Sequence, residues 1–207
     1  MRPFAFFSVL VIMIGVVSSV AGPAIASPKK LVILGDSLTE GYGVSRDAAF
    51  PALLEKKIKA DKKDWVVINA GISGSTSASA VSRLKWQLKS KPDLFVIALG
   101  ANDGLRGLKP EDLEKNLSQA VEAIQKEKIP VVLAGMQMPP NYTKEYAASF
   151  AAVFPRVAKK YGLKTVPFLL EKVAGVTSLN QADGIHPNEK GHAIMAETVY
   201  NSIKGLL

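Results

Sequence analysis

Short apolar runs alternate with segments of helical periodicity along most of this 207-residue chain. Continuous apolar runs of this length are typical of strands buried on both faces, as in parallel sheets that are covered by helices. The runs expected as strands are Leu31–Leu34, Trp65–Ile68, Leu94–Leu99, Pro130–Ala134 and Lys164–Phe168. The pattern therefore predicts a three-layer α/β domain with about five parallel strands flanked by helices.

The segments between these runs place apolar residues three and four positions apart, as amphipathic helices do. The expected helices are Phe50–Lys59, Ser75–Lys89, one beginning at Pro110, Thr143–Tyr161 and Glu189–Leu207. Pro155 falls inside one of them and is expected to kink or split it, because proline removes a helix hydrogen bond. No linker or repeat interrupts residues 27–207, so we expect them to form one domain.

The first 26 residues differ from the rest of the chain and are expected to be a signal peptide. They hold a single charge at Arg2, an apolar run over Phe4–Val20, and small residues that end in Ala24-Ile25-Ala26. A basic start, an apolar stretch and an Ala-x-Ala site predict cleavage after Ala26 and a periplasmic or secreted product. An uncleaved N-terminal membrane anchor is the alternative, since ~20 apolar residues can span a bilayer.

Composition limits the kinds of catalytic or metal site that the chain can form and the kinds of partner that it can bind. The chain has no cysteine and two histidines, which excludes disulfides, thiolate metal sites and a cysteine nucleophile, and we expect neither metal nor cofactor. Lys and Arg outnumber Asp and Glu by 26 to 18. The lysines lie near expected helix ends, and no nucleic-acid-binding motif occurs. We therefore expect a monomer with a solvated basic surface and no nucleic acid, and transient contact with membrane lipids is the alternative.

Polar and glycine-rich segments follow the expected strands, at the edge where ligands bind in parallel α/β sheets. Ser37 comes directly after the first strand, where its hydroxyl can face a cleft. Asp183 and His186 are spaced so that the carboxylate can fold back onto the imidazole, which can then take a proton from a serine. Taken singly, each segment is equally compatible with an ordinary turn that caps a helix.

Gly74 and Asn102 follow the second and third strands. Glycine lets a substrate approach a backbone N–H closely, and an asparagine amide can donate to a developing oxyanion. Turn chemistry alone explains either residue, since both types are common in turns. His192 lies inside the last helix with no acid at turn spacing, so a structural or exposed role is expected.

In combination, these segments resemble the SGNH hydrolase superfamily, also called the GDSL family. The matching blocks are Gly35-Asp36-Ser37-Leu38, Asn69-Ala70-Gly71-Ile72-Ser73-Gly74, Gly100-Ala101-Asn102-Asp103 and Asp183-Gly184-Ile185-His186-Pro187. Over essentially residues 30–205 the chain looks like the bacterial arylesterase, acyl-CoA thioesterase I and lysophospholipase subgroup. The resemblance implies a flavodoxin-like fold, no metal, and a serine hydrolase that acts on small-molecule acyl esters and thioesters.

The resemblance also assigns roles to residues. It implies that Ser37 is the nucleophile, His186 its base, and Asp183 the group that orients the base. The N–H groups of Ser37 and Gly74 and the side chain of Asn102 would form the oxyanion hole. Asp36 and Asp103 would hold these groups in position without touching the substrate.

Apolar loops beyond the strand ends are expected to hold the acyl chain. The residues predicted to touch it are Leu105, Leu108, Met138, Pro139 and Tyr142, with packing of the sheet top as their alternative role. Gln137 stands where close thioesterase relatives carry a basic residue, which leaves the preferred acyl chain open. A carbohydrate O-deacetylase or acyltransferase with the same residues is the alternative function, and a non-enzymatic α/β binding protein is a further one.

Overall fold

The computed structural model describes residues 27–207 and contains a single five-stranded sheet. The strands are β1 Lys29–Gly35, β2 Trp65–Gly71, β3 Leu94–Ala98, β4 Val131–Ala134 and β5 Lys164–Val166. All pairings are parallel, and the strand order is β2-β1-β3-β4-β5. This is the flavodoxin-like order of doubly wound sheets, so the predicted fold class is confirmed. The expected signal peptide, residues 1–26, lies outside the described residues.

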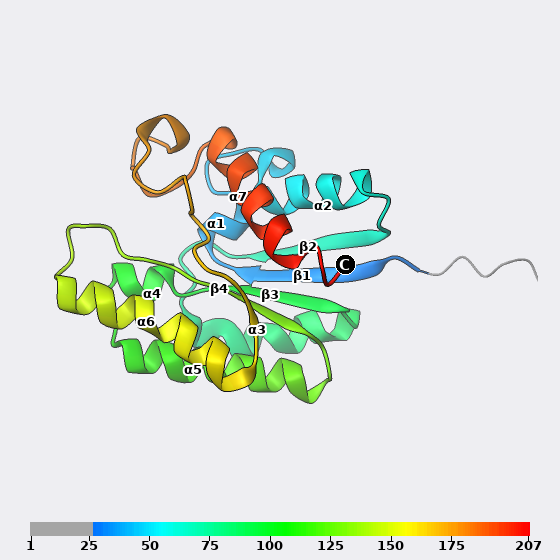
Figure 1. The fold of residues 1–207 in the computed structure, drawn as a ribbon, viewed down its shortest axis with the longest axis horizontal. Coiled ribbons are helices and arrows are strands. Elements are labelled where there is room, and N and C mark those ends of the chain that lie inside the picture. Colours follow the sequence, from blue (N-terminus) through cyan, green and yellow to red (C-terminus); the bar gives the residue numbers. More distant parts are fainter. Residues whose placement is uncertain (1–26) are drawn as a thin grey trace, which may run out of the picture.

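Helices cover both faces of the sheet (Figure 1). The α-helices are α1 Ser37–Glu40, α2 Phe50–Ala60, α3 Ala80–Gln87, α4 Ala101–Leu105, α5 Pro110–Lys126, α6 Lys144–Tyr161 and α7 Glu189–Ile203. Short 3-10 turns are η1 Arg46–Ala48, η2 Ser77–Ser79, η3 Leu88–Ser90 and η4 Thr177–Leu179. Helices α2 and α7 pack together on one face, while α3, α5 and α6 cover the other. In residues 27–207 no helix has the length and apolarity needed to cross a membrane.

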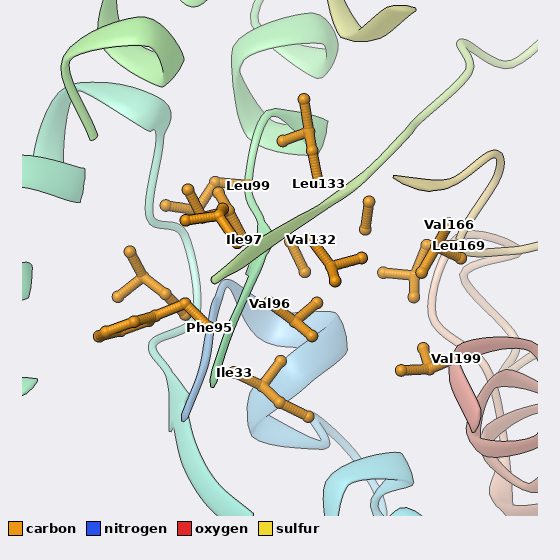
Figure 2. Packing of buried hydrophobic residues seen from close by; sticks show 14 of the residues in the cluster. Ile33, Phe95, Val96, Ile97, Leu99, Val132, Leu133, Val166, Leu169 and Val199 are labelled. Atoms are coloured by element: carbon orange, nitrogen blue, oxygen red, sulfur yellow. The ribbon is translucent and has the colours of Figure 1, made fainter. Parts of the chain in front are cut away.

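The central strands form the core because they are apolar on both sides. Every residue of β3 is buried, as are Leu31–Leu34 of β1. Figure 2 shows Phe95 and Ile97 pointing to one side of β3 and Val96 to the other, toward α7. Successive strand residues face opposite ways, so each apolar run supplies both cores at once.

Two sequence predictions are corrected by the structure. The helix expected over Ser75–Lys89 begins as the 3-10 turn η2 and becomes α-helical only at Ala80. Pro155 does not split α6, which continues from Lys144 to Tyr161. Pro155 lies on the exposed side of that helix, where water can reach the carbonyl that lacks a helix donor.

The register of the sheet brings the polar segments to one edge. Gly35, the last residue of β1, is level with Gly71 in β2 and with Ala98 in β3. The segments that follow these three strands therefore begin at the same height on neighbouring strands. In Figure 1, α1, α4 and the segment after β5 all lie at this end of the sheet.

Candidate active site

Ser37 is the first residue of α1 and follows β1 after a single intervening residue. That residue, Asp36, is the N-cap of α1, and its Oδ1 accepts the N–H of Leu38 at 3.0 Å. Asp36 is 1% exposed. Its burial raises the pKa of this carboxyl to about 6, although the Leu38 N–H favours the charged form. The cap therefore fixes the start of α1 and with it the position of the Ser37 side chain.

The imidazole of His186 bridges Ser37 and Asp183. Its Nε2 lies 3.0 Å from the Ser37 Oγ, and its Nδ1 lies 2.7 Å from Oδ2 of Asp183. A carboxylate on Nδ1 keeps the proton on that nitrogen, which leaves Nε2 free to accept the serine proton. The structure thus brings together the three residues that the sequence predicted for this relay.

A tight turn holds Asp183 under the imidazole. Its Oδ1 accepts the N–H groups of Ile185 and His186, both at 3.0 Å. Gly184 between them has φ +75°, a conformation that favours glycine. Although partial burial opposes ionisation, the bonds from the backbone N–H and ring of His186 and from Ile185 N–H lower the pKa of Asp183. The carboxylate therefore stays charged beside the imidazole.

Asn102 belongs to α4 and lines the cavity beside Ser37, and Gly74 lies in the segment after β2. The Nδ2 of Asn102 donates to the Ser75 carbonyl at 3.1 Å, which uses one of its two hydrogens. The Gly74 carbonyl accepts Nη2 of Arg106 at 2.8 Å. Within residues 27–207, neither the N–H of Ser37 nor that of Gly74 donates to another residue. In this part of the chain the N–H groups of Ser37 and Gly74 and one Nδ2 hydrogen of Asn102 therefore have no hydrogen-bond acceptor.

Buried Asp103 ties α4 to the turn that follows Gly74. Its Oδ2 accepts the N–H of Ser77 at 2.8 Å, and its Oδ1 accepts the Ser77 hydroxyl at 2.5 Å. Asn116 of α5 donates to the same hydroxyl at 3.0 Å. Asp103 therefore links α4, which carries Asn102, to η2, which follows the Gly74 segment.

A cavity of about 480 Å³ opens beside Ser37 and His186. Of the residues predicted to touch an acyl chain, Leu105, Met138 and Pro139 line it. Leu108 and Tyr142 are not among the lining residues, and the Tyr142 hydroxyl instead donates to the Leu105 carbonyl at 2.8 Å. Met136 and Pro140, which belong to the loop 136–142 expected from the sequence as a pocket wall, also line it. The apolar lining residues that the sequence did not predict as walls are Leu38, Ala101, Phe168, Leu170, Ala174 and Ile185.

The remaining histidine, His192, is fully buried between α7 and α2. Its Nδ1 accepts the N–H of Phe50 at 3.2 Å, so the predicted structural role agrees with its position. Burial lowers the pKa of His192 to about 4, which keeps the ring neutral near pH 7. Among the described residues, no cluster of three or more His, Asp or Glu side chains is placed to hold a metal.

The comparison with protein families agrees with this arrangement. The GDSL-like Lipase/Acylhydrolase family matches residues 33–194. The chain belongs to this family. As a GDSL-family hydrolase it is an enzyme that cleaves carboxylic esters, and all four polar blocks fall inside the matched range.

Full-length relatives extend the similarity beyond the motifs. Esterase TesA of Pseudomonas aeruginosa is 40% identical over 183 residues, 88% of this chain and 91% of that protein. Thioesterase 1/protease 1/lysophospholipase L1 of Escherichia coli K12 is 36% identical over 183 residues, 88% of this chain and 86% of that protein. A crystal structure of TesA superposes with a TM-score of 0.84 at 40% identity, covering 86% of this chain and all of that one.

Proposed function

We propose that this GDSL-family protein is an exported hydrolase of carboxylic esters and thioesters that works through an acyl-enzyme on Ser37. The observation that carries the proposal is the relay from Ser37 through His186 to Asp183, with contacts of 3.0 and 2.7 Å at the mouth of a cavity. A serine hydroxyl is a weak nucleophile until a neighbouring base takes its proton.

Acylation begins when the Ser37 Oγ bonds to the substrate carbonyl carbon and its proton passes to Nε2 of His186. The carbonyl π electrons move onto oxygen and form a tetrahedral oxyanion. Its collapse breaks the bond to the alcohol or thiol, and the imidazolium returns its proton to that leaving group. Asp183 stabilises the transient positive charge on the ring.

Deacylation repeats these steps with water as the nucleophile. His186 takes a proton from the water, whose oxygen attacks the acyl carbon. The second tetrahedral oxyanion then collapses and breaks the bond to the Ser37 Oγ, which recovers its proton from the ring. The products are the free carboxylic acid and the original enzyme.

The oxyanion would be held by the N–H groups of Ser37 and Gly74 and by the second Nδ2 hydrogen of Asn102. These groups stay in place before the charge develops, because Asp36 caps α1 and Asp103 fixes the Gly74 segment. Preorganised donors of this kind stabilise the transition state more than the ground state.

The cavity supports a substrate with an apolar acyl group. Its walls combine Met136 and Met138 with Phe168 and Leu170, and no Asp, Glu, Lys or Arg side chain is among the residues that line it. Methionine side chains adapt to irregular apolar shapes. The names of the relatives, an esterase and a thioesterase with lysophospholipase activity, support the same substrate class.

Residues 1–26 support the export part of the proposal through their sequence. A single basic residue precedes the apolar run Phe4–Val20, and Ala24-Ile25-Ala26 provides the small-residue site. Expression of the full chain in a bacterial host should yield a periplasmic or secreted protein that begins at Ser27. N-terminal sequencing tests this, and an intact Met1 in the membrane fraction would support the anchor instead.

The deciding experiment measures turnover of p-nitrophenyl esters of graded chain length beside acyl-CoA and a lysophospholipid. Ser37→Ala should lower ester turnover by more than ~10⁴-fold while the protein stays folded. Ser82→Ala is the matched control, since Ser82 is an exposed serine of α3. Wild-type turnover in Ser37→Ala would refute the mechanism, and a sharp preference for the acetyl ester with no activity on longer acyl groups would favour the deacetylase alternative.

A further inference from the structure

We propose that Gln181 is a positioning residue that holds the segment bearing Ser37 against the turn bearing His186. The inference rests on the proposed function, because it concerns the distance between that nucleophile and that base. Gln181 belongs to none of the four sequence blocks, and it is absent from the residues that line the cavity.

The turn with Asp183 and His186 requires a tether because regular structure does not supply one. It lies in the chain between β5, which ends at Val166, and α7, which begins at Glu189. The 3-10 turn η4 is the only helical element in that interval of the structure. A long segment of this kind samples several conformations unless specific contacts hold it.

The backbone of Gln181 closes the turn. Its N–H donates to the His186 carbonyl at 2.8 Å, and its carbonyl accepts the N–H of Gly184 at 3.0 Å. These two bonds bracket Asp183 and His186 within one hydrogen-bonded loop. The internal shape of the turn therefore depends on the backbone of Gln181.

The side chain of Gln181 joins this turn to the nucleophile segment. Its Nε2 donates to the Tyr42 carbonyl at 2.7 Å and to the Pro187 carbonyl at 2.9 Å. Both hydrogens of the amide are thus used, one on each segment. The Tyr42 ring also packs against the His186 ring, with centroids 4.7 Å apart.

A continuous path of hydrogen bonds follows from these contacts. The Tyr42 N–H donates to the Ser37 carbonyl at 3.0 Å, Gln181 donates to the Tyr42 carbonyl, and the Gln181 N–H donates to the His186 carbonyl. Among the hydrogen bonds of residues 27–207, the other one that joins residues 37–48 to 181–187 is the Ser37–His186 contact itself. The path therefore sets the separation of nucleophile and base independently of the reacting atoms.

The side-chain amide of Gln181 packs directly against Gly43, which leaves room for it because glycine has no Cβ. Gly43 has φ +76°, and a Cβ at this position would lie 2.0 Å from Oε1 of Gln181. A side chain there would push the amide away from the Tyr42 carbonyl. The glycine and the glutamine form one arrangement, so disturbing either of them should have the same effect.

The first test replaces Gln181 with methionine, which keeps the length of the side chain and removes both donors. We expect kcat on a p-nitrophenyl ester to fall between ~10-fold and ~100-fold with KM unchanged, because small misplacements of catalytic groups lower the rate of the chemical step. The rate at which a small phosphonate labels Ser37 should fall by the same factor. If Gln181 had a purely structural role, the substitution would change the melting temperature without lowering kcat at constant KM.

Gln125→Met is the matched control. Gln125 also donates its side-chain amide to a carbonyl of another element, Tyr161, at 3.2 Å, far from the site. Its kcat and labelling rate should equal those of the wild type. If Gln181→Met fails to fold, Gln181→Glu replaces it, since glutamate keeps the shape and cannot donate to the two carbonyls.

The second test uses Gly43→Ala alone and combined with Gln181→Met. Because both changes break the same path, the double variant should lose no more kcat than the more impaired single variant. Multiplicative losses, an unchanged kcat in Gln181→Met, or a raised KM with normal kcat would each overturn the inference. Ser37→Ala separates the two proposals: if it abolishes turnover while Gln181→Met is normal, only the role of Gln181 is refuted.

Discussion

The Nε2 of His186 lies 3.0 Å from the Oγ of Ser37, although the two residues are 149 positions apart in the chain. The two side chains meet because β1 and the segment before α7 both end at the carboxyl edge of the sheet (Figure 1). The contact joins the start of the fold to its end, so it forms only when the whole domain is assembled.

Asn102→Ala should lower kcat by ~10²–10³-fold with a smaller change in KM, because a lost oxyanion donor weakens the transition state more than substrate binding. Initial rates on a p-nitrophenyl ester measure the effect. Asn201→Ala, at an exposed asparagine of α7, is the control and should be unchanged. An unaltered kcat in Asn102→Ala would remove Asn102 from the oxyanion hole.

Gly104→Ala should impair binding of long acyl chains. A Cβ at Gly104 would lie 2.2 Å from Sδ of Met138 and 2.8 Å from the ring of Phe150, so Met138 must leave its place in the cavity wall. We expect the KM for long-chain esters to rise more than the KM for the acetate ester. Overpacking should also lower the free energy of unfolding by ~1–3 kcal/mol. Equal KM changes across the chain lengths would show that Met138 does not contact the acyl chain.

Asp36→Asn should stabilise the protein above pH 6. The folded pKa of Asp36, about 6, exceeds the ordinary 3.8 of an aspartate, so its contribution to stability is complete below pH ~4 and is lost as pH rises through 6. Asparagine caps a helix equally well and does not ionise. Urea unfolding should show a gain of up to roughly 3 kcal/mol at pH 8 and none at pH 4.

The control for this comparison is Asp112→Asn, at an exposed position in the first turn of α5. Its pH profile of unfolding free energy should run parallel to that of the wild type. A parallel profile for Asp36→Asn as well would contradict the raised pKa of Asp36.

His192→Gln should flatten the acid side of the stability profile. The folded pKa of His192 is about 4, below the ordinary 6.5. Between pH 4 and pH 6.5 the imidazole is therefore protonated in the unfolded chain and neutral in the folded protein. The wild type therefore loses roughly 3 kcal/mol from this residue as pH falls from 6.5 to 4. The variant starts from lower stability at pH 7 and should lose less on acidification. An equal loss in both proteins would contradict the assignment.

The local pattern of apolar residues was sufficient to predict the strands of the sheet. The apolar run Leu94–Leu99 predicts β3 closely, because a strand buried on both faces requires apolar residues throughout. The sequence could not predict that α6 continues through Pro155, since the effect of a proline depends on which side of the helix faces water, and that follows from packing.

The segment after β5 contributes to the site through residues that no sequence pattern marks. Phe168 and Leu170 of this segment line the cavity, and Gln181 of the same segment bonds to the Tyr42 carbonyl. These residues follow no helical or strand periodicity in the sequence. Leu108 and Tyr142 lie close in sequence to wall residues but do not line the cavity, and the Tyr142 hydroxyl donates to the Leu105 carbonyl instead. Irregular segments take their side-chain directions from long-range contacts, which a local pattern does not contain.

The amino-acid sequence by itself determined the order of strands and helices and the chemical types at the strand ends, because these depend on periodicity and on turn chemistry between near neighbours. It thereby identified Ser37, Asp183 and His186 as residues that could act together. Only the tertiary structure decided their separations, the walls of the cavity and the path through Gln181. Those depend on contacts between residues more than a hundred positions apart, whose free energy is gained only when the sheet and its loops pack together.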